Sequence, residues 1–76
     1  MLKQQSLLAQ TALDSSSLQS VGYAAEARTM EITFRNGSIY RYFEVPSHTH
    51  DALLSAISKG RYFTAAIRSN FRFKRL

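Results

Sequence analysis

The sequence predicts an α+β domain: a three-stranded antiparallel β-meander followed by one or two helices and a basic C-terminal arm. Two observations carry this prediction. Residues 30–45 contain two alternating runs of aromatic and β-branched residues on either side of Asn36-Gly37, a pair that strongly favours a hairpin turn. After Pro46 the apolar residues recur with helical spacing instead, and the chain ends in a stretch rich in arginine and lysine.

The length and composition are those of one small globular domain. The chain has 76 residues, of which 45% are hydrophobic and 20% charged. A domain of this size has little core to spare. It has no cysteine, so disulfides and thiolate metal sites are excluded. We therefore expect packing alone, or packing with help from a partner chain, to hold the fold.

Residues 1–14 are expected to form an N-terminal tail or a short helix, and residues 15–76 the domain. The boundary is the polar stretch Asp14-Ser15-Ser16-Ser17. A helix this short is marginal in water on its own, so the tail and a helix docked on a partner both stay open. The first residues lack the apolar core of a signal peptide, and no run is long enough to span a membrane. We expect a cytoplasmic protein.

The first strand of the predicted meander, within residues 18–25, has a weaker signal than the other two. Gly22 interrupts it and marks a bulge or a bend. Residues 26–28 would then turn the chain into the main hairpin. Such a sheet needs a helical layer on one face.

Two hairpin registers fit the sequence. A two-residue turn at Asn36-Gly37 puts Phe34 opposite Ile39 and leaves Tyr40 and Tyr42 away from the Met30 and Phe43 layer. A three-residue loop with a G1 bulge puts Phe34 opposite Ser38, and both tyrosines then share a face with Met30 and Ile32. One residue of slip exchanges the two faces, so the pattern leaves both registers open.

The helical part begins after Pro46. Ser47 is placed as an N-cap, and Gly60 as the residue that ends the helix. The apolar stripe that should cover the sheet is His50, Leu53, Leu54 and Ile57. A second helix is expected over residues 61–69, with Arg61 and Arg68 towards solvent. Residues 71–76 alternate apolar and basic, as an edge strand or an extended arm would.

Charge is unevenly distributed along the chain. The formal net charge is +5 and the pI about 10.1, which favours polyanionic partners such as nucleic acid. All acidic residues precede residue 52, whereas the chain from Lys59 onward carries only basic ones. The C-terminal part is therefore the expected anion-binding region, although an uneven surface charge also serves solubility.

No constellation for catalysis or metal binding is present. His48 and His50 are two residues apart, and on a helix they point in nearly opposite directions. No serine lies in a nucleophile-elbow motif, and no glycines form a phosphate-binding loop. We expect no enzyme activity, no catalytic or metal-binding residue, no cofactor, and no small-molecule substrate.

Three groups of residues together resemble the KTSC domain, a small family named after the C-terminal extension of some lysyl-tRNA synthetases. They are Ser17 with Val21-Gly22-Tyr23, the pattern from Met30 to Val45-Pro46 with Tyr40-x-Tyr42, and Ala56-x-Ser58-x-Gly60-x-Tyr62-Phe63 with Ile67-Arg68. The resemblance covers roughly residues 15–74. It implies a stand-alone member of bacterial or phage type, and its link to a tRNA synthetase places RNA ahead of DNA.

The chemistry of the sequence fits binding to nucleic acid. Aromatic and cationic side chains are interleaved, as in proteins that stack bases while neutralising phosphates. Many of the aromatics must also fill the core. The candidate binding residues are Tyr40, Arg41, Tyr42, Lys59, Arg61, Arg68, Arg72, Lys74 and Arg75.

The alternative function is protein interaction through a homodimer. The strand over residues 39–45 is apolar on both faces, with Ile39 and Phe43 on one and Tyr40 and Tyr42 on the other. A sheet covered by one helical layer needs only one apolar face. The surplus face would be buried by a second copy or by the N-terminal segment.

Overall fold

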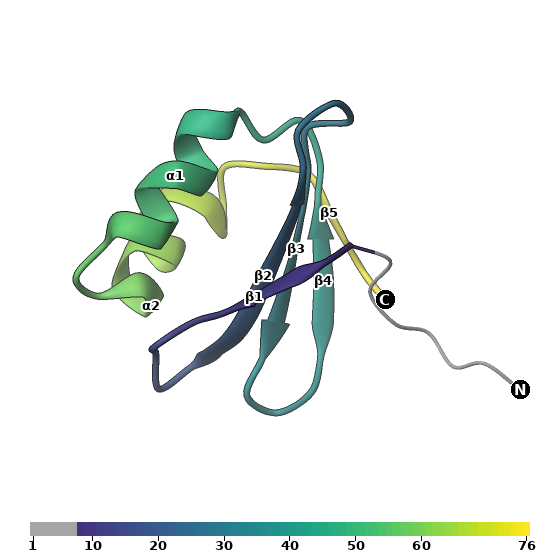
Figure 1. Ribbon diagram of the computed structural model, residues 1–76. Coiled ribbons are helices and arrows are strands. Elements are labelled where there is room, and N and C mark those ends of the chain that lie inside the picture. Colours follow the sequence, from purple (N-terminus) through teal and green to yellow (C-terminus); the bar gives the residue numbers. More distant parts are fainter. Residues whose placement is uncertain (1–7) are drawn as a thin grey trace, which may run out of the picture.

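The computed structural model describes residues 8–76 and shows one antiparallel sheet with helices on one side (Figure 1). Five strands lie in sequence order: β1 (Gln10–Ala12), β2 (Leu18–Ala24), β3 (Thr29–Phe34), β4 (Ile39–Tyr42) and β5 (Phe73–Arg75). The helical elements α1 (Ser47–Ser55), α2 (Lys59–Tyr62) and η1 (Phe63–Ile67) lie between β4 and β5 in the sequence. The fold class is α+β, as predicted.

The prediction of a three-stranded sheet was wrong, because a short strand is added at each edge of the meander. β5 pairs with β4, which makes the alternating C-terminal residues an edge strand rather than a free arm. β1 pairs with β2, so residues 10–12 of the expected tail or helix are extended. Residues 1–7 of that expected segment lie outside the described part of the chain. Short strands gain their stability from the neighbour they pair with, so local pattern reveals them poorly.

The turn between β3 and β4 adopts the three-residue loop with a G1 bulge. The Phe34 N–H donates to the Ser38 carbonyl and the Gly37 N–H to the Phe34 carbonyl, both at 2.9 Å. Gly37 has φ +93°, a region that favours glycine. The register that follows pairs Ile32 with Tyr40. Of the two registers that the sequence allows, this is the one that puts both tyrosines on the face of Met30 and Ile32.

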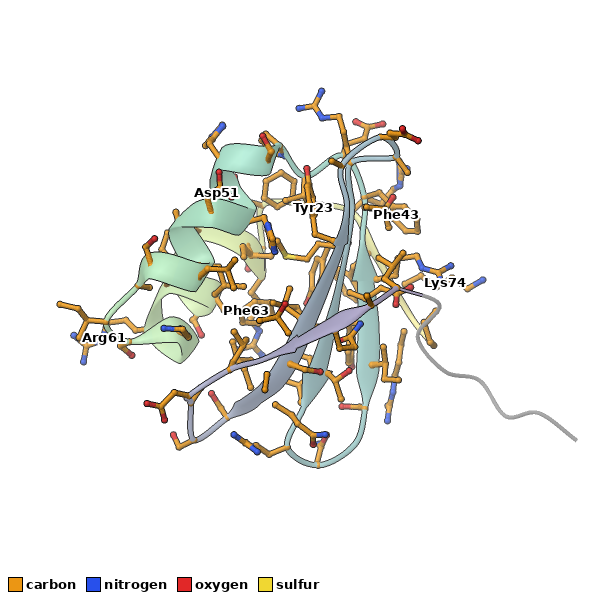
Figure 2. All side chains as sticks on the ribbon, viewed as in Figure 1. Tyr23, Phe43, Asp51, Arg61, Phe63 and Lys74 are labelled. Atoms are coloured by element: carbon orange, nitrogen blue, oxygen red, sulfur yellow. The ribbon has the colours of Figure 1, made fainter. Side chains whose placement is uncertain are left out.

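The inner face of the sheet is the face covered by the helices. It carries Val21, Ile32 and Tyr40 in one cross-strand row, and Tyr23, Met30, Tyr42 and Phe73 in the next. The core between sheet and helices consists of Leu13, Leu18, Val21, Met30, Ile32, Tyr42, Val45, Leu53, Phe63 and Ile67. Figure 2 shows Phe63 between the two layers, whereas Phe43 and Lys74 lie on the opposite side of the sheet.

No helix formed by residues 8–76 lies over the outer face. One row of cross-strand neighbours runs across the entire sheet: Gln10, Gly22, Glu31, Arg41 and Lys74. The expected bulge near Gly22 occurs earlier in β2, between Leu18 and Ser20. Gly22 itself permits a close approach, because a Cβ there would lie 2.9 Å from the Leu8 Cβ and 3.0 Å from the Ala9 carbonyl.

The helices begin and end differently from the prediction. Pro46 is the N-cap of α1 and no side chain caps that end, so the expected Ser47 cap is not formed. Gly60 lies inside α2 and does not end α1. Instead, Ala56 is the C-cap of α1, and the Lys59 Nζ donates to the Ala56 carbonyl at 2.8 Å. No helix in residues 8–76 is both long and apolar enough to cross a membrane.

Leu53 was correctly placed in the predicted stripe and is fully buried, with His50 and Leu54 half-buried beside it. Ile57 was wrongly placed there. It follows the end of α1 and is fully exposed. Helical spacing predicts which residues share a face only within the helix, and Ile57 lies beyond the end of α1.

Candidate functional site

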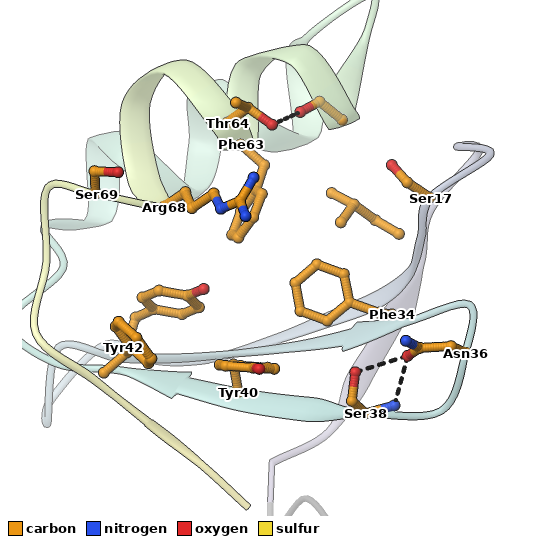
Figure 3. Close-up of a pocket in the computed structure, with 13 residues that line it drawn as sticks. Ser17, Phe34, Asn36, Ser38, Tyr40, Tyr42, Phe63, Thr64, Arg68 and Ser69 are labelled. Atoms are coloured by element: carbon orange, nitrogen blue, oxygen red, sulfur yellow. Dashed lines mark hydrogen bonds between the residues drawn. The ribbon is translucent and has the colours of Figure 1, made fainter.

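A groove of about 580 Å³ opens between the inner face of the sheet and the α2–η1 segment (Figure 3). We call it the aromatic groove, because five of its lining residues are aromatic: Phe34, Tyr40, Tyr42, Phe63 and Phe73. The others are Ser17, Leu18, Asn36, Ser38, Gly60, Thr64, Arg68 and Ser69. Among residues 8–76, Arg68 is therefore the single charged residue that lines it, and no carboxylate does.

The aromatic rings contact one another in a continuous network. Phe63 packs edge-on against Phe34 and Tyr42, with ring centroids 5.5 and 5.7 Å apart. Phe73 lies 5.6 Å from both Tyr40 and Tyr42. These separations are those of favourable aromatic pairs, which hold the rings in place. Phe73 is 52% exposed, so part of this pre-organised surface is open to a ligand.

The π-helical turn η1 places Arg68 in the groove. In an α-helix, a residue five positions after Phe63 would lie about 140° around the axis from it. Here the Arg68 N–H donates to the Phe63 carbonyl at 2.9 Å, an i to i+5 bond that widens the turn. Arg68 therefore lies on the same side of the helix as Phe63, instead of pointing away as the predicted second helix implied. In Figure 3 its side chain extends from the helical wall into the groove.

Tyr42 faces Arg68 from the sheet wall of the groove. Its hydroxyl points into the space between the two walls (Figure 3). Burial raises the pKa of Tyr42 to about 12; the neighbouring Tyr40 contributes to the rise, and Arg68 partly offsets it. At neutral pH the hydroxyl is protonated and can donate a hydrogen bond. Arg68 makes no ion pair with any residue from 8 to 76. The groove thus offers a hydroxyl donor and a guanidinium side by side.

The structure divides the nine predicted binding residues among three places. Tyr40, Tyr42 and Arg68 line the aromatic groove, and the Arg75 guanidinium lies 5.9 Å from the Tyr40 ring centroid. Lys59 and Arg61 lie on α2. The remaining three are on the outer face or at its edge: Arg41, Arg72 and Lys74.

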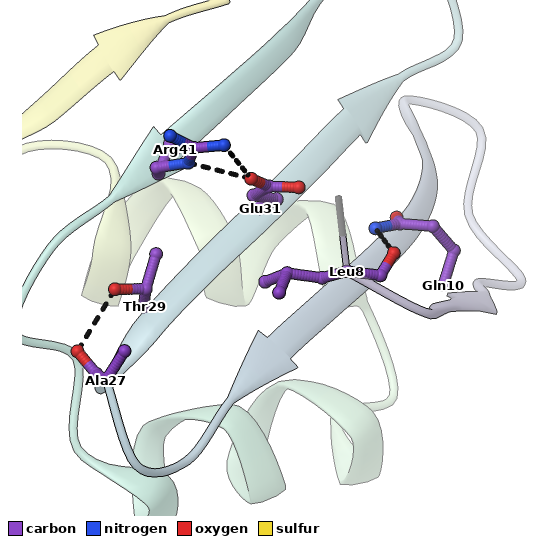
Figure 4. Close-up of polar contacts among 6 residues, drawn as sticks. All are labelled: Leu8, Gln10, Ala27, Thr29, Glu31 and Arg41. Atoms are coloured by element: carbon purple, nitrogen blue, oxygen red, sulfur yellow. Dashed lines mark hydrogen bonds and ion pairs between the residues drawn. The ribbon is translucent and has the colours of Figure 1, made fainter. Parts of the chain in front are cut away.

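Several of these cations already have partners. Arg41 is ion-paired with Glu31 (Figure 4), and Arg72 lies over the Phe43 ring at 5.1 Å. Lys59 is hydrogen-bonded to the end of α1. The residues that the sequence analysis left out are mainly Phe34, Phe63 and Phe73. The period-two alternation of residues 71–76 was the signal for Phe73, since it puts Phe73 and Arg75 on the same face.

One of the two histidines, His50, takes a structural position. His50 stacks on Tyr23, with ring centroids 4.7 Å apart, and the Tyr23 hydroxyl donates to the Val45 carbonyl at 2.6 Å. His50 Nδ1 lies 3.8 Å from an Asp51 carboxylate oxygen. Within residues 8–76, no three His, Asp or Glu side chains gather in a group that could hold a metal ion.

Comparison with known proteins identifies the family. The KTSC domain model matches residues 14–71. A crystal structure of a KTSC domain protein from Yersinia pestis superimposes with a TM-score of 0.86 and 36% identity, covering 91% of this chain and 97% of that one. An uncharacterised protein of Stutzerimonas stutzeri is 42% identical over 66 residues, which are 86% of this chain and 93% of that protein.

Longer proteins contain a similar region. A lysine–tRNA ligase of Nostoc punctiforme is 35% identical over 63 residues, 83% of this chain but 11% of the ligase. A second Nostoc lysine–tRNA ligase matches to the same extent. The chain thus spans about a tenth of these ligases and nearly all of the stand-alone relative. Together with the fold, these matches show that the chain belongs to the KTSC domain family.

Proposed function

We propose that this protein is a small nucleic-acid-binding module that takes single-stranded RNA into the aromatic groove and acts by binding rather than catalysis. The observation that carries the proposal is the combination of the aromatic rings, of which Phe73 is 52% exposed, with the Arg68 guanidinium, which makes no ion pair with residues 8–76. Base stacking on aromatic side chains is worth about 1–3 kcal/mol per base, and nearby cations neutralise the phosphates.

The charge and volume of the groove support the same ligand. The groove has a cation and no carboxylate among its lining residues, and the chain carries a net charge of +5. Its volume of about 580 Å³ falls in the range of sites that enclose a small molecule, which is the size of one nucleotide with its base. RNA is placed ahead of DNA because the longer relatives are named as lysine–tRNA ligases.

Fluorescence anisotropy with labelled single-stranded RNA, single-stranded DNA and duplex DNA, at several salt concentrations, tests the proposal. We expect the RNA to bind best, and Arg68→Gln to weaken it about tenfold, the value of one charge-assisted contact. Removing one phosphate contact should also reduce the magnitude of the salt slope by about 0.7. Phe73→Ser should weaken binding through lost stacking.

Arg28→Gln is the matched control, because it removes the same charge from the β2–β3 turn. Equal losses in Arg28→Gln and Arg68→Gln would mean that net charge alone attracts the RNA. Absence of binding to any of the three nucleic acids near physiological salt would refute the proposal. Circular dichroism on each variant shows whether the fold is retained.

A homodimer built on the outer face is the second candidate function. It is favoured by Ile39 and Phe43, which remain only half-buried there, with no helix from the described part of the chain over them. Sedimentation equilibrium of the wild type and of Ile39→Lys measures it directly. A dimer that this substitution dissociates would support an assembly role, and a monomer at every concentration would exclude it.

A further inference from the structure

The Tyr42 hydroxyl lacks a hydrogen-bond partner within the protein. Tyr42 is 3% exposed, and its hydroxyl makes no hydrogen bond with any residue from 8 to 76. Within the same residues, every buried side-chain oxygen or nitrogen that is sealed from solvent does have a partner. The Tyr42 oxygen therefore opens onto the aromatic groove, into which it points in Figure 3. A polar group that a buried residue leaves without a protein partner is available to a ligand.

Three other aromatic rings hold the ring that carries this hydroxyl. Phe63 packs edge-on against it with centroids 5.7 Å apart, Phe73 lies at 5.6 Å, and Tyr40 stacks on it at 6.5 Å. The phenolic oxygen lies in the plane of the ring, so a ring that is held in place also fixes the oxygen. The hydroxyl is therefore positioned before any ligand arrives, which lowers the entropic cost of binding.

Arg68 faces this hydroxyl from the helical wall of the groove (Figure 3). A guanidinium only donates hydrogen bonds, and the Tyr42 hydroxyl is protonated at neutral pH because burial raises its pKa to about 12. The two groups make no hydrogen bond with each other, and Arg68 has no ion-pair partner among residues 8–76. Two donors directed at the same space call for a ligand group with several acceptor oxygens. A phosphate is such a group, and its negative charge also complements the guanidinium.

We infer that the Tyr42 hydroxyl and the Arg68 guanidinium form one oxyanion site, which holds a phosphate of the ligand between the two walls of the groove. This inference rests on the proposed function and adds Tyr42 as a second residue that selects for phosphate. The Tyr42 ring belongs to the packing of the groove, whereas its hydroxyl serves the ligand. The ligand class is therefore nucleotides, and a nucleoside without phosphate should bind much more weakly.

Tyr42→Phe tests the site, because it keeps the ring and removes only the hydroxyl. With labelled single-stranded RNA, we expect this variant to bind about tenfold more weakly than the wild type. Its salt slope should stay that of the wild type, since no charge is removed, whereas Arg68→Gln reduces the slope. Tyr62→Phe is the matched control. Tyr62 lies on α2 and does not line the groove, so removing its hydroxyl should leave the affinity unchanged.

NMR titration gives a second readout, through the side-chain N–H signal of Arg68. Uridine monophosphate should shift this signal in the wild type and much less in Tyr42→Phe, and uridine should shift it in neither protein. Urea denaturation at neutral pH checks the fold. Tyr42→Phe should unfold at the urea concentration of the wild type, because the hydroxyl has no partner in the free protein. Tyr23→Phe should unfold earlier, since it loses the hydrogen bond to the Val45 carbonyl.

The outcomes separate the oxyanion site from the RNA-binding proposal. If Tyr42→Phe binds RNA as the wild type does while Arg68→Gln binds it more weakly, the oxyanion site is wrong and the RNA proposal stands. If RNA does not bind but uridine monophosphate shifts the Arg68 signal only when the Tyr42 hydroxyl is present, the site stands and the RNA proposal fails. If neither ligand binds, both fail. A signal that uridine shifts as strongly as the monophosphate does would also overturn the site.

Discussion

Arg41 holds Glu31 across β3 and β4 on the outer face of the sheet, with its Nη2 2.6 Å and its Nε 2.7 Å from one carboxylate oxygen (Figure 4). The Glu31 side chain is only 1% exposed although no helix formed by residues 8–76 covers this face. A carboxylate with so little access to water needs a charged partner. Arg41, at 25% exposure, supplies it and is thereby committed to the fold rather than to an external anion.

Arg41→Ala should therefore lower the free energy of unfolding by roughly 3 kcal/mol, the lower end for a broken buried pair, because Arg41 itself reaches solvent. Urea denaturation measures this. Arg72→Ala is the matched control. The Arg72 guanidinium lies over the Phe43 ring, so this substitution should lower the free energy of unfolding by less than about 1 kcal/mol. Equal, small losses in both variants would show that the Glu31 pair behaves as a surface salt bridge.

Gly22→Ala should disturb the segment before β1. The added Cβ would lie within 3.0 Å of atoms of Leu8, Ala9 and Gln10, one of which is the Ala9 backbone carbonyl oxygen. We expect destabilisation of about 1–3 kcal/mol, as for other overpacked sites. The N-terminal segment should also be cleaved faster by a protease. Unchanged stability and cleavage would mean that this segment does not lie over Gly22 in solution.

Gly37→Ala tests a backbone effect alone, because a Cβ at Gly37 would meet no atom within 4 Å. An alanine held at this left-handed φ of +93° should still lower the free energy of unfolding by about 1–2 kcal/mol. Thermal or urea unfolding gives the value. Gly60→Ala is the comparison: it meets the rotatable Ser17 hydroxyl and gains helix propensity, so it should change stability little. A loss in Gly60→Ala as large as in Gly37→Ala would contradict this account.

Tyr42 should make stability fall at alkaline pH. Its folded-state pKa of about 12 lies above the ordinary tyrosine value of 10.0, so the unfolded chain loses this proton first as the pH rises. The contribution is fully present below about pH 10 and is lost as the pH rises towards 12. Urea midpoints of the wild type and Tyr42→Phe, compared across this range, isolate it. Parallel decreases in the two proteins would show that Tyr42 is not the cause.

The sequence predicted those parts of the structure that local chemistry decides. Asn36-Gly37 forced a hairpin because few other residues accept the turn conformation, and Gly37 does adopt a positive φ. The alternation of residues 71–76 indicated an extended segment. The helical region after Pro46 was recognised, but the caps of α1 were not, because they are Pro46 and Ala56 rather than Ser47 and Gly60.

The candidate site was only partly predictable, because its residues come from distant parts of the chain. Tyr40, Tyr42 and Arg68 were named from the sequence, yet they were grouped with Arg41 and Lys74, which lie on the other face of the sheet. Neighbours along a strand point to opposite faces, so a run of basic and aromatic residues is divided between two surfaces.

The sequence by itself determined the hairpin, the helical segment and the basic C-terminal end, since turn conformation, periodicity and charge are properties of nearby residues. Only the tertiary structure decided the register that buries Tyr42, the addition of β1 and β5, and the π-turn that aims Arg68 into the aromatic groove. Each of these depends on pairing or packing between segments far apart in the chain, where a shift of one residue reverses which side chains meet.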